Sequence, residues 1–193
     1  KVCEILQTTV KQSSFNLAEL RVLDLGAGNG MVGEILKGLG VCRLVGVDII
    51  PEAKNAAERD RPGIYDEYYV ADIMALAEEQ MDDLASWELD CLMSVAALGF
   101  GDIPKDAFIQ AFNLLRNEGW VAFNIKETFL DNSDTSGLST TIRELIFSEY
   151  LDLYHLERYR HRLSIEGEPL YYFAIAGRKN ADIPPEFIEN TRE

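Results

Sequence analysis

A glycine-rich turn follows an apolar run near the start of the chain. The run Val22–Leu25 contains Asp24 and leads into Gly26, Ala27, Gly28, Asn29 and Gly30. Glycines permit a sharp turn and the close approach of a flat or bulky ligand, and the amides that open the following helix attract a carboxylate. Asp24 is placed to take a positively charged amino group. The segment is therefore expected to bind an amino-acid moiety, which carries both charges.

An acidic residue followed by glycines at alternate positions resembles the first motif of the class I S-adenosylmethionine-dependent methyltransferases. The resemblance implies that S-adenosyl-L-methionine is the cofactor. It also implies that Asp48 binds both ribose hydroxyls, for which a carboxylate is suited because it accepts two hydrogen bonds at once. The residues expected to bind the cofactor are Asp24, Gly26, Ala27, Gly28, Asn29, Gly30, Asp48, Ile49, Asp72, Ile73, Ser94 and Val95.

The same resemblance places Asp72 near the adenine amino group and the segment Ser94–Ala97 beside the methionine part of the cofactor. A single acidic residue at a strand end is also a common helix cap, so Asp72 alone decides little. Within the family, Gly33-Glu34 and Tyr65-Asp66 resemble the small methyltransferase-like proteins related to the Williams-Beuren region member.

A second interpretation fits part of the same segment. Gly28, Gly30 and Gly33 satisfy the G-x-G-x-x-G pattern, and Asp48 follows at about the distance that suits the ribose of a nicotinamide dinucleotide. Three features favour the methyl donor: Asp24 ahead of the glycines, Asp72 at a strand end, and a hairpin near the C-terminus. An NAD-dependent oxidoreductase remains the less favoured alternative.

The elements that must position these residues alternate between strand and helix. Apolar runs indicate strands at Arg21–Leu25, Leu44–Val47, Tyr68–Ala71, Leu89–Val95 and Trp120–Ile125. Helical spacing indicates helices at Met31–Leu39, Pro51–Asp60, Ala75–Leu84, Pro104–Asn117 and Ile142–Tyr150. The extended segments Leu153–Ile165 and Leu170–Ala176 then form a hairpin. The predicted fold is α/β and Rossmann-like: a mainly parallel seven-stranded sheet with helices on both faces and a C-terminal antiparallel hairpin.

The length of 193 residues fits one domain, with a helical segment over 1–20 and a surface tail over 180–193. The chain begins with Lys1 rather than Met, so we expect the natural protein to continue before it. No apolar run is long enough to cross a bilayer or to serve as a secretory signal, which predicts a cytoplasmic protein without membrane contact. The three cysteines show no metal-ligand spacing and are expected to be buried free thiols.

Charge limits the choice of methyl acceptor. The net charge of -15 should repel phosphate backbones, which argues against nucleic acid. Methyltransferases of exocyclic amines or glutamine amides carry Asn or Asp, two prolines and an aromatic residue after the fourth strand, where this chain has Ser94-Val95-Ala96-Ala97. We therefore expect a small-molecule acceptor. A cofactor-binding partner subunit or sensor without turnover is the alternative.

No dedicated base is required, because alignment of acceptor and methyl group in a dry pocket supplies much of the catalysis. His155 and His161 are the histidines available, and their even spacing places them on one side of a strand. The loop from Glu127 to Gly137 lies where ligands bind in such folds. Alternation also predicts one strand face that carries Arg158, Arg160 and Arg162 together with Tyr154 and Leu156, either solvated or open to an acidic substrate.

Overall fold

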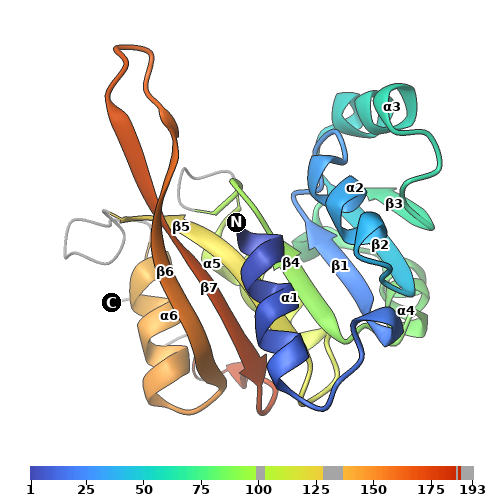
Figure 1. Cartoon of the computed structure of the whole chain (residues 1–193). Helices are drawn as coiled ribbons and strands as arrows, with labels where there is room; N and C mark the ends of the chain where they lie inside the picture. Colours follow the sequence, from blue (N-terminus) through green and yellow to red (C-terminus); the bar gives the residue numbers. More distant parts are fainter. Residues whose placement is uncertain (99–102, 128–136, 186, 188–193) are drawn as a thin grey trace.

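A computed structural model describes residues 1–98, 103–127, 137–185 and 187 of the chain. Its seven-stranded sheet has the order β3-β2-β1-β4-β5-β7-β6 (Figure 1). The first five strands run parallel, and β7 and β6 join antiparallel to them and to each other. The strands are β1 (Arg21–Leu25), β2 (Arg43–Asp48), β3 (Glu67–Val70), β4 (Cys91–Ser94), β5 (Trp120–Lys126), β6 (Leu151–Leu163) and β7 (Pro169–Lys179).

Helices cover both faces of this sheet, as the alternation of side chains along the strands requires. The α1 face buries Val22 and Leu44 against α1 (Val2–Gln12) and α2 (Met31–Gly38), and α3 (Pro51–Asp60) packs beside β3. The α5 face buries Leu23 and Leu25 against α4 (Glu78–Ser86), α5 (Lys105–Asn113) and α6 (Leu138–Phe147). Short 3-10 turns occur at η1 (Leu17–Glu19) and η2 (Ile73–Ala75). The predicted fold class is confirmed.

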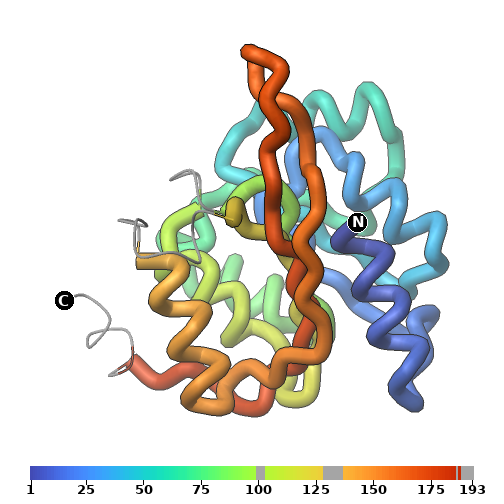
Figure 2. The backbone as a smooth tube through the Cα atoms, turned by 60° about the vertical axis from the view of Figure 1, so that its left-hand side comes forward, coloured from blue at the N-terminus to red at the C-terminus, as the bar shows by residue number. Residues whose placement is uncertain are grey.

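The hairpin of β6 and β7 rises beyond the end of its neighbour β5. Residue Lys126 at the end of β5 pairs with Tyr172, whereas β6 and β7 continue to pair as far as Leu163 and Pro169. Figures 1 and 2 show this part of the hairpin standing above the edge of the sheet at which the parallel strands end. In Figure 2 the hairpin separates α1 from α5 and α6.

Several predicted boundaries differ from the observed ones. The helix expected from Ala75 begins at Glu78, because Asp72 accepts a hydrogen bond from the Met74 N–H at 2.9 Å and closes the η2 turn first. Helix α6 begins at Leu138, four residues before the predicted start, and ends at Phe147, where the chain turns into β6. Cys42 is exposed rather than buried, since it lies in the short link before β2.

Two bulges in the hairpin overturn the predicted arginine face. Register shifts occur between Leu153 and His155 and between Arg160 and Arg162, and each shift breaks the alternation of side chains. Tyr154 therefore packs on Trp120 of the α1 face, with ring centroids 5.6 Å apart. Arg162 lies opposite Leu170, which shares its side of β7 with Ala174 and Ala176 of the same face. The predicted face with three arginines and Tyr154 is wrong.

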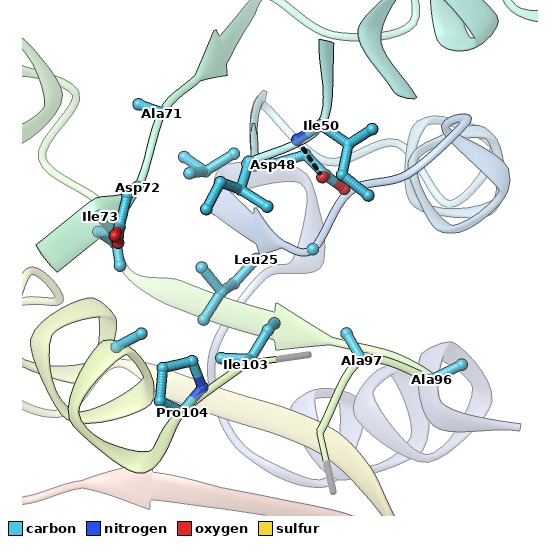
Figure 3. A pocket seen from close by; sticks show the side chains of 14 residues that line it. Leu25, Asp48, Ile50, Ala71, Asp72, Ile73, Ala96, Ala97, Ile103 and Pro104 are labelled. Atoms are coloured by element: carbon cyan, nitrogen blue, oxygen red, sulfur yellow. Dashed lines mark hydrogen bonds between the residues drawn. The ribbon is translucent and has the colours of Figure 1, made fainter. Parts of the chain in front are cut away.

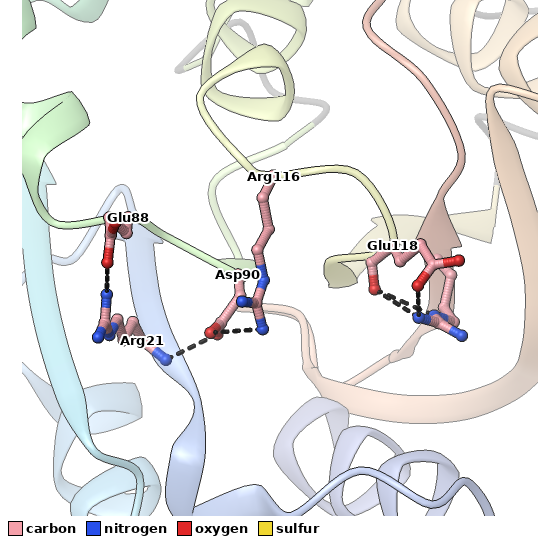
Figure 4. Close-up of polar contacts among 6 residues, drawn as sticks. Arg21, Glu88, Asp90, Arg116 and Glu118 are labelled. Carbon is pink, nitrogen blue, oxygen red and sulfur yellow. Dashed lines mark hydrogen bonds and ion pairs between the residues drawn. The ribbon is translucent and has the colours of Figure 1, made fainter.

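Asp90 joins the beginnings of three strands at the edge where the parallel strands start (Figure 4). Its carboxylate accepts the Arg21 N–H at 2.7 Å and pairs with the Arg116 guanidinium at 3.3 Å. Its own N–H donates to the Arg21 carbonyl, and its carbonyl accepts the Trp120 N–H at 2.8 Å. The starts of β1, β4 and β5 are thus fixed together, so their other ends reach a common edge.

Within the described ranges, no helix is long and apolar enough to span a membrane. The same ranges contain no group of three or more side chains that could hold a metal ion.

Candidate functional site

A pocket of about 340 Å³ lies at the edge where the parallel strands end (Figure 3). The ends of β1, β2 and β3 form one side, and the segment after β4 and the start of α5 form the other. Its lining is mostly apolar, with two carboxylates among the side chains. The lining residues are Leu25, Gly26, Val47, Asp48, Ile49, Ile50, Ala71, Asp72, Ile73, Ala96, Ala97, Ile103, Pro104 and Ala107.

The glycine turn after β1 has the backbone that its sequence requires. Gly26, Gly28 and Gly30 have φ values of +74°, +55° and +83°, a region that residues with a Cβ rarely adopt. A Cβ on Gly26 would also lie 2.7 Å from the Cβ of Ala97, so this glycine lets the segment after β4 approach the turn. The N–H groups of Gly26 and Ala27 donate to the Val47 carbonyl and tie the turn to β2.

Three side chains between the end of α3 and the middle of β3 bind consecutive carbonyl oxygens of this turn. The Tyr65 hydroxyl lies 3.3 Å from the Ala27 oxygen, and the Tyr68 hydroxyl donates to the Gly28 oxygen at 2.8 Å. The Arg61 guanidinium donates to the Asn29 oxygen at 3.1 Å. We call Arg61, Tyr65 and Tyr68 the turn clamp. The clamp fixes the orientation of the peptide groups of the glycine turn before any ligand binds.

Asp48, at the end of β2, is half-buried and lines the pocket. One carboxylate oxygen accepts the Gly28 N–H at 2.9 Å and the other accepts the Ile50 N–H at 3.0 Å. A carboxylate oxygen can accept two hydrogen bonds, so each still has capacity for a ligand hydroxyl. Both carboxylate oxygens are held in place by backbone groups, which fits the expected grip on two ribose hydroxyls.

Apolar groups flank the two carboxylates. Ile49 and Ile50 follow Asp48 and are 61% and 52% exposed, so their apolar side chains are accessible to a ligand in the pocket. Asp72 is exposed and caps the η2 turn, so it has the plain capping role as well as a place in the pocket wall. Ile73 is buried behind it. Apolar surface next to a carboxylate suits an adenosine group, with a flat ring and a diol.

Asp24 does not line this pocket. Its carboxylate is 1% exposed, and its only described hydrogen bond comes from the Tyr65 hydroxyl at 2.8 Å. Burial raises the pKa of Asp24 to about 7, an effect that the Tyr65 hydrogen bond partly offsets and that nearby Asp48 increases. Of the glycine turn, Gly26 lines this pocket, whereas Ala27, Gly28, Asn29 and Gly30 are not among its lining residues.

After β4, the residues at the pocket are the later ones of the predicted segment. Ser94 is fully buried, and its hydroxyl donates to the Leu25 carbonyl at 3.0 Å, while Val95 packs into the core of the α1 face. Ala96 and Ala97 line the pocket instead. The apolar start of α5 also belongs to the wall, and small apolar residues there give no chemical signal in the sequence.

The residues considered for the acceptor lie on the hairpin and in the loop after β5. His155 and His161 both face the α1 side of β6, as predicted, since His155 pairs with Ala176 and His161 contacts Tyr172 with ring centroids 4.4 Å apart. Arg158 pairs with Glu127 at 2.6 Å on the opposite side. Residues 128–136 of the predicted acceptor loop lie outside the described residues.

Comparison with solved structures shows the same fold in several methyltransferases. The magnesium protoporphyrin IX methyltransferase of Synechocystis PCC 6803, solved with bound SAM, is 14% identical, with 93% of this chain and 78% of that chain covered and a TM-score of 0.64. The N-methyltransferase NodS of Bradyrhizobium japonicum WM9, in complex with S-adenosyl-l-homocysteine, is 18% identical, with coverage of 93% and 85% and a TM-score of 0.62. The ribosomal protein L11 methylase of Lactobacillus delbrueckii subsp. bulgaricus is 16% identical, with coverage of 93% and 79% and a TM-score of 0.58. At these identities the likeness establishes a shared fold.

A search of curated protein sequences finds no match. The model of the family described as "Methyltransferase domain" matches residues 23–123, more than half of the 193 residues and the region from β1 through most of β5. This region contains the glycine turn, both pocket carboxylates and the wall after β4. The chain therefore belongs to the methyltransferase domain family, the class of S-adenosylmethionine-dependent enzymes that its glycine turn predicts.

Proposed function

We propose that the chain binds S-adenosylmethionine in the pocket at the ends of β1, β2 and β3 and transfers its methyl group to a small-molecule acceptor. The observation that carries the proposal is Asp48, whose two oxygens are oriented by backbone amides at 2.9 and 3.0 Å at the mouth of an apolar pocket. When bound, the cofactor supplies a methyl group on a positively charged sulfur. The protein's part is to hold it, exclude water and align the acceptor.

In this proposal each wall of the pocket has its own role. Asp48 accepts hydrogen bonds from the ribose hydroxyls, and Ile49 with Ile73 contacts the adenine ring. The exposed carboxylate of Asp72 accepts a hydrogen bond from the adenine amino group. The glycine turn, with its peptides oriented by the turn clamp, contacts the methionine part, and Asp24 contributes negative potential from behind the turn.

The acceptor is proposed to be a small molecule on grounds of charge. With 33 acidic and 18 basic residues, the chain repels polyanions such as nucleic acid. The solved relatives carry the names of enzymes for a porphyrin, for N-methylation and for a ribosomal protein, so the shared fold does not choose among acceptors. The segment Ser94–Ala97 also lacks the two prolines expected of amine methyltransferases of bases and glutamine.

We also propose kinship with the small Williams-Beuren-related group. The residues that carry this resemblance meet in space: a Cβ on Gly33 would lie 2.9 Å from the Tyr65 ring, so a glycine at 33 leaves room for Tyr65 of the turn clamp. Asp66 beside it pairs with Lys37 at 2.7 Å and accepts the Leu44 N–H. Gly33 and the Tyr65-Asp66 pair therefore work as one unit behind the glycine turn.

The first experiment is calorimetric titration of the protein with S-adenosylmethionine, S-adenosylhomocysteine and NAD. We expect micromolar binding of the two adenosyl compounds and none of NAD. Asp48→Ala should abolish binding, and Asp48→Asn, which keeps one carbonyl oxygen as an acceptor, should weaken it less. Asp60→Asn on the exposed side of α3 is the matched control and should bind like the wild type. Binding of NAD alone would overturn the proposal.

The acceptor class requires a second experiment. The protein is incubated with methyl-labelled S-adenosylmethionine and with separate metabolite, protein and RNA fractions of a cell extract. Label in the metabolite fraction supports a small-molecule acceptor, and label in either other fraction contradicts it. Tight cofactor binding with no label transferred to any fraction would favour the alternative function, a cofactor-binding partner or sensor.

A further inference from the structure

A chain of hydrogen bonds leads from the wall of the cofactor pocket to the overhanging hairpin. The Ala96 N–H donates to the Asn124 side-chain oxygen at 2.7 Å. The Asn124 amide nitrogen donates to the Tyr159 hydroxyl, also at 2.7 Å. The Tyr159 hydroxyl lies 3.2 Å from Nδ1 of His161. The chain therefore crosses from the end of β4 through β5 to β6.

The first member of this chain has a strained backbone. Ala96 has a φ of +60°, in the left-handed region, and it lines the pocket. A residue with a Cβ is strained in this region, and such strain persists only where surrounding contacts enforce it. The short bond to Asn124 is the described contact on the Ala96 amide. It is placed to enforce this conformation.

A buried asparagine at position 124 lowers stability unless its amide group makes hydrogen bonds. It is fully buried in the middle of β5, where its neighbours Phe123 and Ile125 are apolar. Burying an amide costs free energy unless its hydrogen bonds are made, and an apolar side chain would avoid that cost. Both ends of the Asn124 amide are satisfied, one by Ala96 and one by Tyr159. Ala174 of β7, which pairs with Asn124, is small enough for Tyr159 to reach across it.

The donors and acceptors fix the direction of each hydrogen bond in this series. Because the Asn124 oxygen accepts from Ala96, its nitrogen must donate to Tyr159, and the Tyr159 O–H is then free to donate to His161. That last bond requires an unprotonated Nδ1. Burial lowers the pKa of His161, and Arg162 lowers it further, so the neutral ring prevails at pH 7. Tyr159 and Tyr172 face this ring, the charge of Arg162 acts on it, and the charge of Lys1 acts on neighbouring Tyr159.

We propose that Asn124 and Tyr159 are positioning residues that hold Ala96 in the pocket wall, with His161 as the outer acceptor that fixes the Tyr159 hydroxyl. The proposal rests on the proposed function, since it is the S-adenosylmethionine pocket whose wall is held. It makes the hairpin a functional part of the pocket, although no hairpin residue lines it. It also makes cofactor affinity depend on the protonation of His161, because a protonated Nδ1 cannot accept the Tyr159 hydrogen.

The test uses three variants of the full chain. Tyr159→Phe removes one hydroxyl and keeps the ring. His161→Asn keeps an acceptor oxygen near the place of Nδ1 but cannot be protonated. Tyr154→Phe is the matched control, because Tyr154 lies on the same strand and packs its ring on Trp120 without a described hydroxyl bond. Each is studied by hydrogen exchange of the Ala96 amide without cofactor and by calorimetric titration with S-adenosylhomocysteine between pH 5 and pH 8.

We expect Tyr159→Phe to speed exchange of the Ala96 amide at least tenfold and to weaken S-adenosylhomocysteine binding about tenfold, while Tyr154→Phe changes neither. His161→Asn should bind like the wild type at pH 8 and lose less affinity than the wild type as the pH falls to 5. Comparing His161→Asn with the wild type cancels the effect of Asp24 on the pH dependence of affinity, because Asp24 titrates in both proteins.

Wild-type exchange and affinity in Tyr159→Phe would overturn the inference while leaving the proposed function intact. Faster exchange with unchanged affinity would also overturn it, because the chain would then not act on the pocket. Failure of the wild type itself to bind S-adenosylhomocysteine would instead reject the proposed function. The exchange of the Ala96 amide would still decide whether Tyr159 holds this segment.

Discussion

Asp24 and Asp48 lie on neighbouring strands and differ in the groups that donate hydrogen bonds to their carboxylates. Asp48 is half-buried, and two backbone amides hold its oxygens, so it stays oriented toward a ligand. Asp24 is enclosed by the core of the α1 face and receives one described hydrogen bond, from Tyr65. Two carboxylates on adjacent strands thus differ in burial and in hydrogen-bond partners, which their positions in the sequence do not reveal.

The first prediction concerns Asp24 and pH. Its folded pKa of about 7 lies above the ordinary value of 3.8. Such a group favours the folded state most below pH 4, and this contribution is lost as the pH rises through 7. Asp24→Asn keeps an oxygen for Tyr65 and carries no charge. Its free energy of unfolding should therefore exceed that of the wild type at pH 8, by several kcal/mol at about 1.4 kcal/mol per pKa unit.

Urea unfolding at pH 5, 6.5 and 8 checks this prediction, with Asp60→Asn on the surface of α3 as the control. The difference between Asp24→Asn and the wild type should grow across this range, and the control should follow the wild type. A constant difference would show that Asp24 is ionised throughout, and the burial argument would be wrong.

The second prediction concerns the turn clamp. Tyr68→Phe removes the hydrogen bond to the Gly28 oxygen, which has a typical net value of about 1 kcal/mol, and leaves that carbonyl without its described partner. If the clamp orients the glycine turn, S-adenosylhomocysteine should bind roughly fivefold more weakly, measured by calorimetry. Tyr69→Phe is the control, because the Tyr69 hydroxyl contacts Asp83 and Trp87 away from the pocket. Equal affinities of the two variants would contradict a role for Tyr68 in binding.

At the scale of elements, the two ends of α5 have different roles. Its amino end contributes Pro104 and Ala107 to the pocket wall. Its carboxyl end is capped by Lys179 of β7, a fully buried lysine whose ammonium group donates to the carbonyls of Phe112, Asn113 and Leu115 and pairs with Asp182. A cation at the carboxyl end of a helix also interacts favourably with the helix dipole.

The third prediction is that Lys179→Met lowers the free energy of unfolding by roughly 2–3 kcal/mol, because buried carbonyls lose a charged donor. Affinity for S-adenosylhomocysteine should hardly change, since the pocket lies at the other end of α5. Arg178→Met is the neighbouring control: its guanidinium binds the exposed Glu118 and should cost less. Urea unfolding and calorimetry on both variants test the separation. A large loss of affinity in Lys179→Met would show that the cap and the pocket are coupled.

Element order was predictable because apolar runs and helical spacing are local properties. The glycine turn was predictable because residue type, φ and function coincide at Gly26, Gly28 and Gly30. The bulges were not predictable. Most side chains of β6 are at least partly exposed, so its residue types do not reveal where an extra residue is inserted, and this insertion turns Tyr154 to the other face.

The partners of the predicted site residues were not predictable either. The turn clamp joins residues that are 32 to 40 positions apart in the chain, and the pairing of β2 with both β1 and β3 brings them together. The start of α5 enters the pocket because β4 lies next to β1 in the sheet. Asn124 did carry a signal, as a polar residue inside the apolar run Trp120–Ile125.

For the whole molecule, charge is the property that most limits partners. The excess of acidic residues leaves a net charge of -15, and most described ion pairs are at least partly exposed. Exposed pairs contribute only about 0–1 kcal/mol each, whereas the surplus charge repels itself across the whole surface. Repulsion between unpaired carboxylates should therefore exceed the stabilisation from ion pairs.

The fourth prediction follows from this balance. Raising the salt concentration from 0.01 M to 0.1 M shortens the Debye length from about 30 Å to about 10 Å, which screens the long-range repulsion more than the close pairs. The melting temperature at pH 8 should rise by a few degrees, since 1 kcal/mol corresponds to about 2–4 °C for a chain of this size. Calorimetric scans at both salt concentrations, repeated at the pI of about 4.5, provide the control. There the net charge is small and the shift should nearly vanish, whereas a melting temperature that falls with salt at pH 8 would mean that the ion pairs dominate.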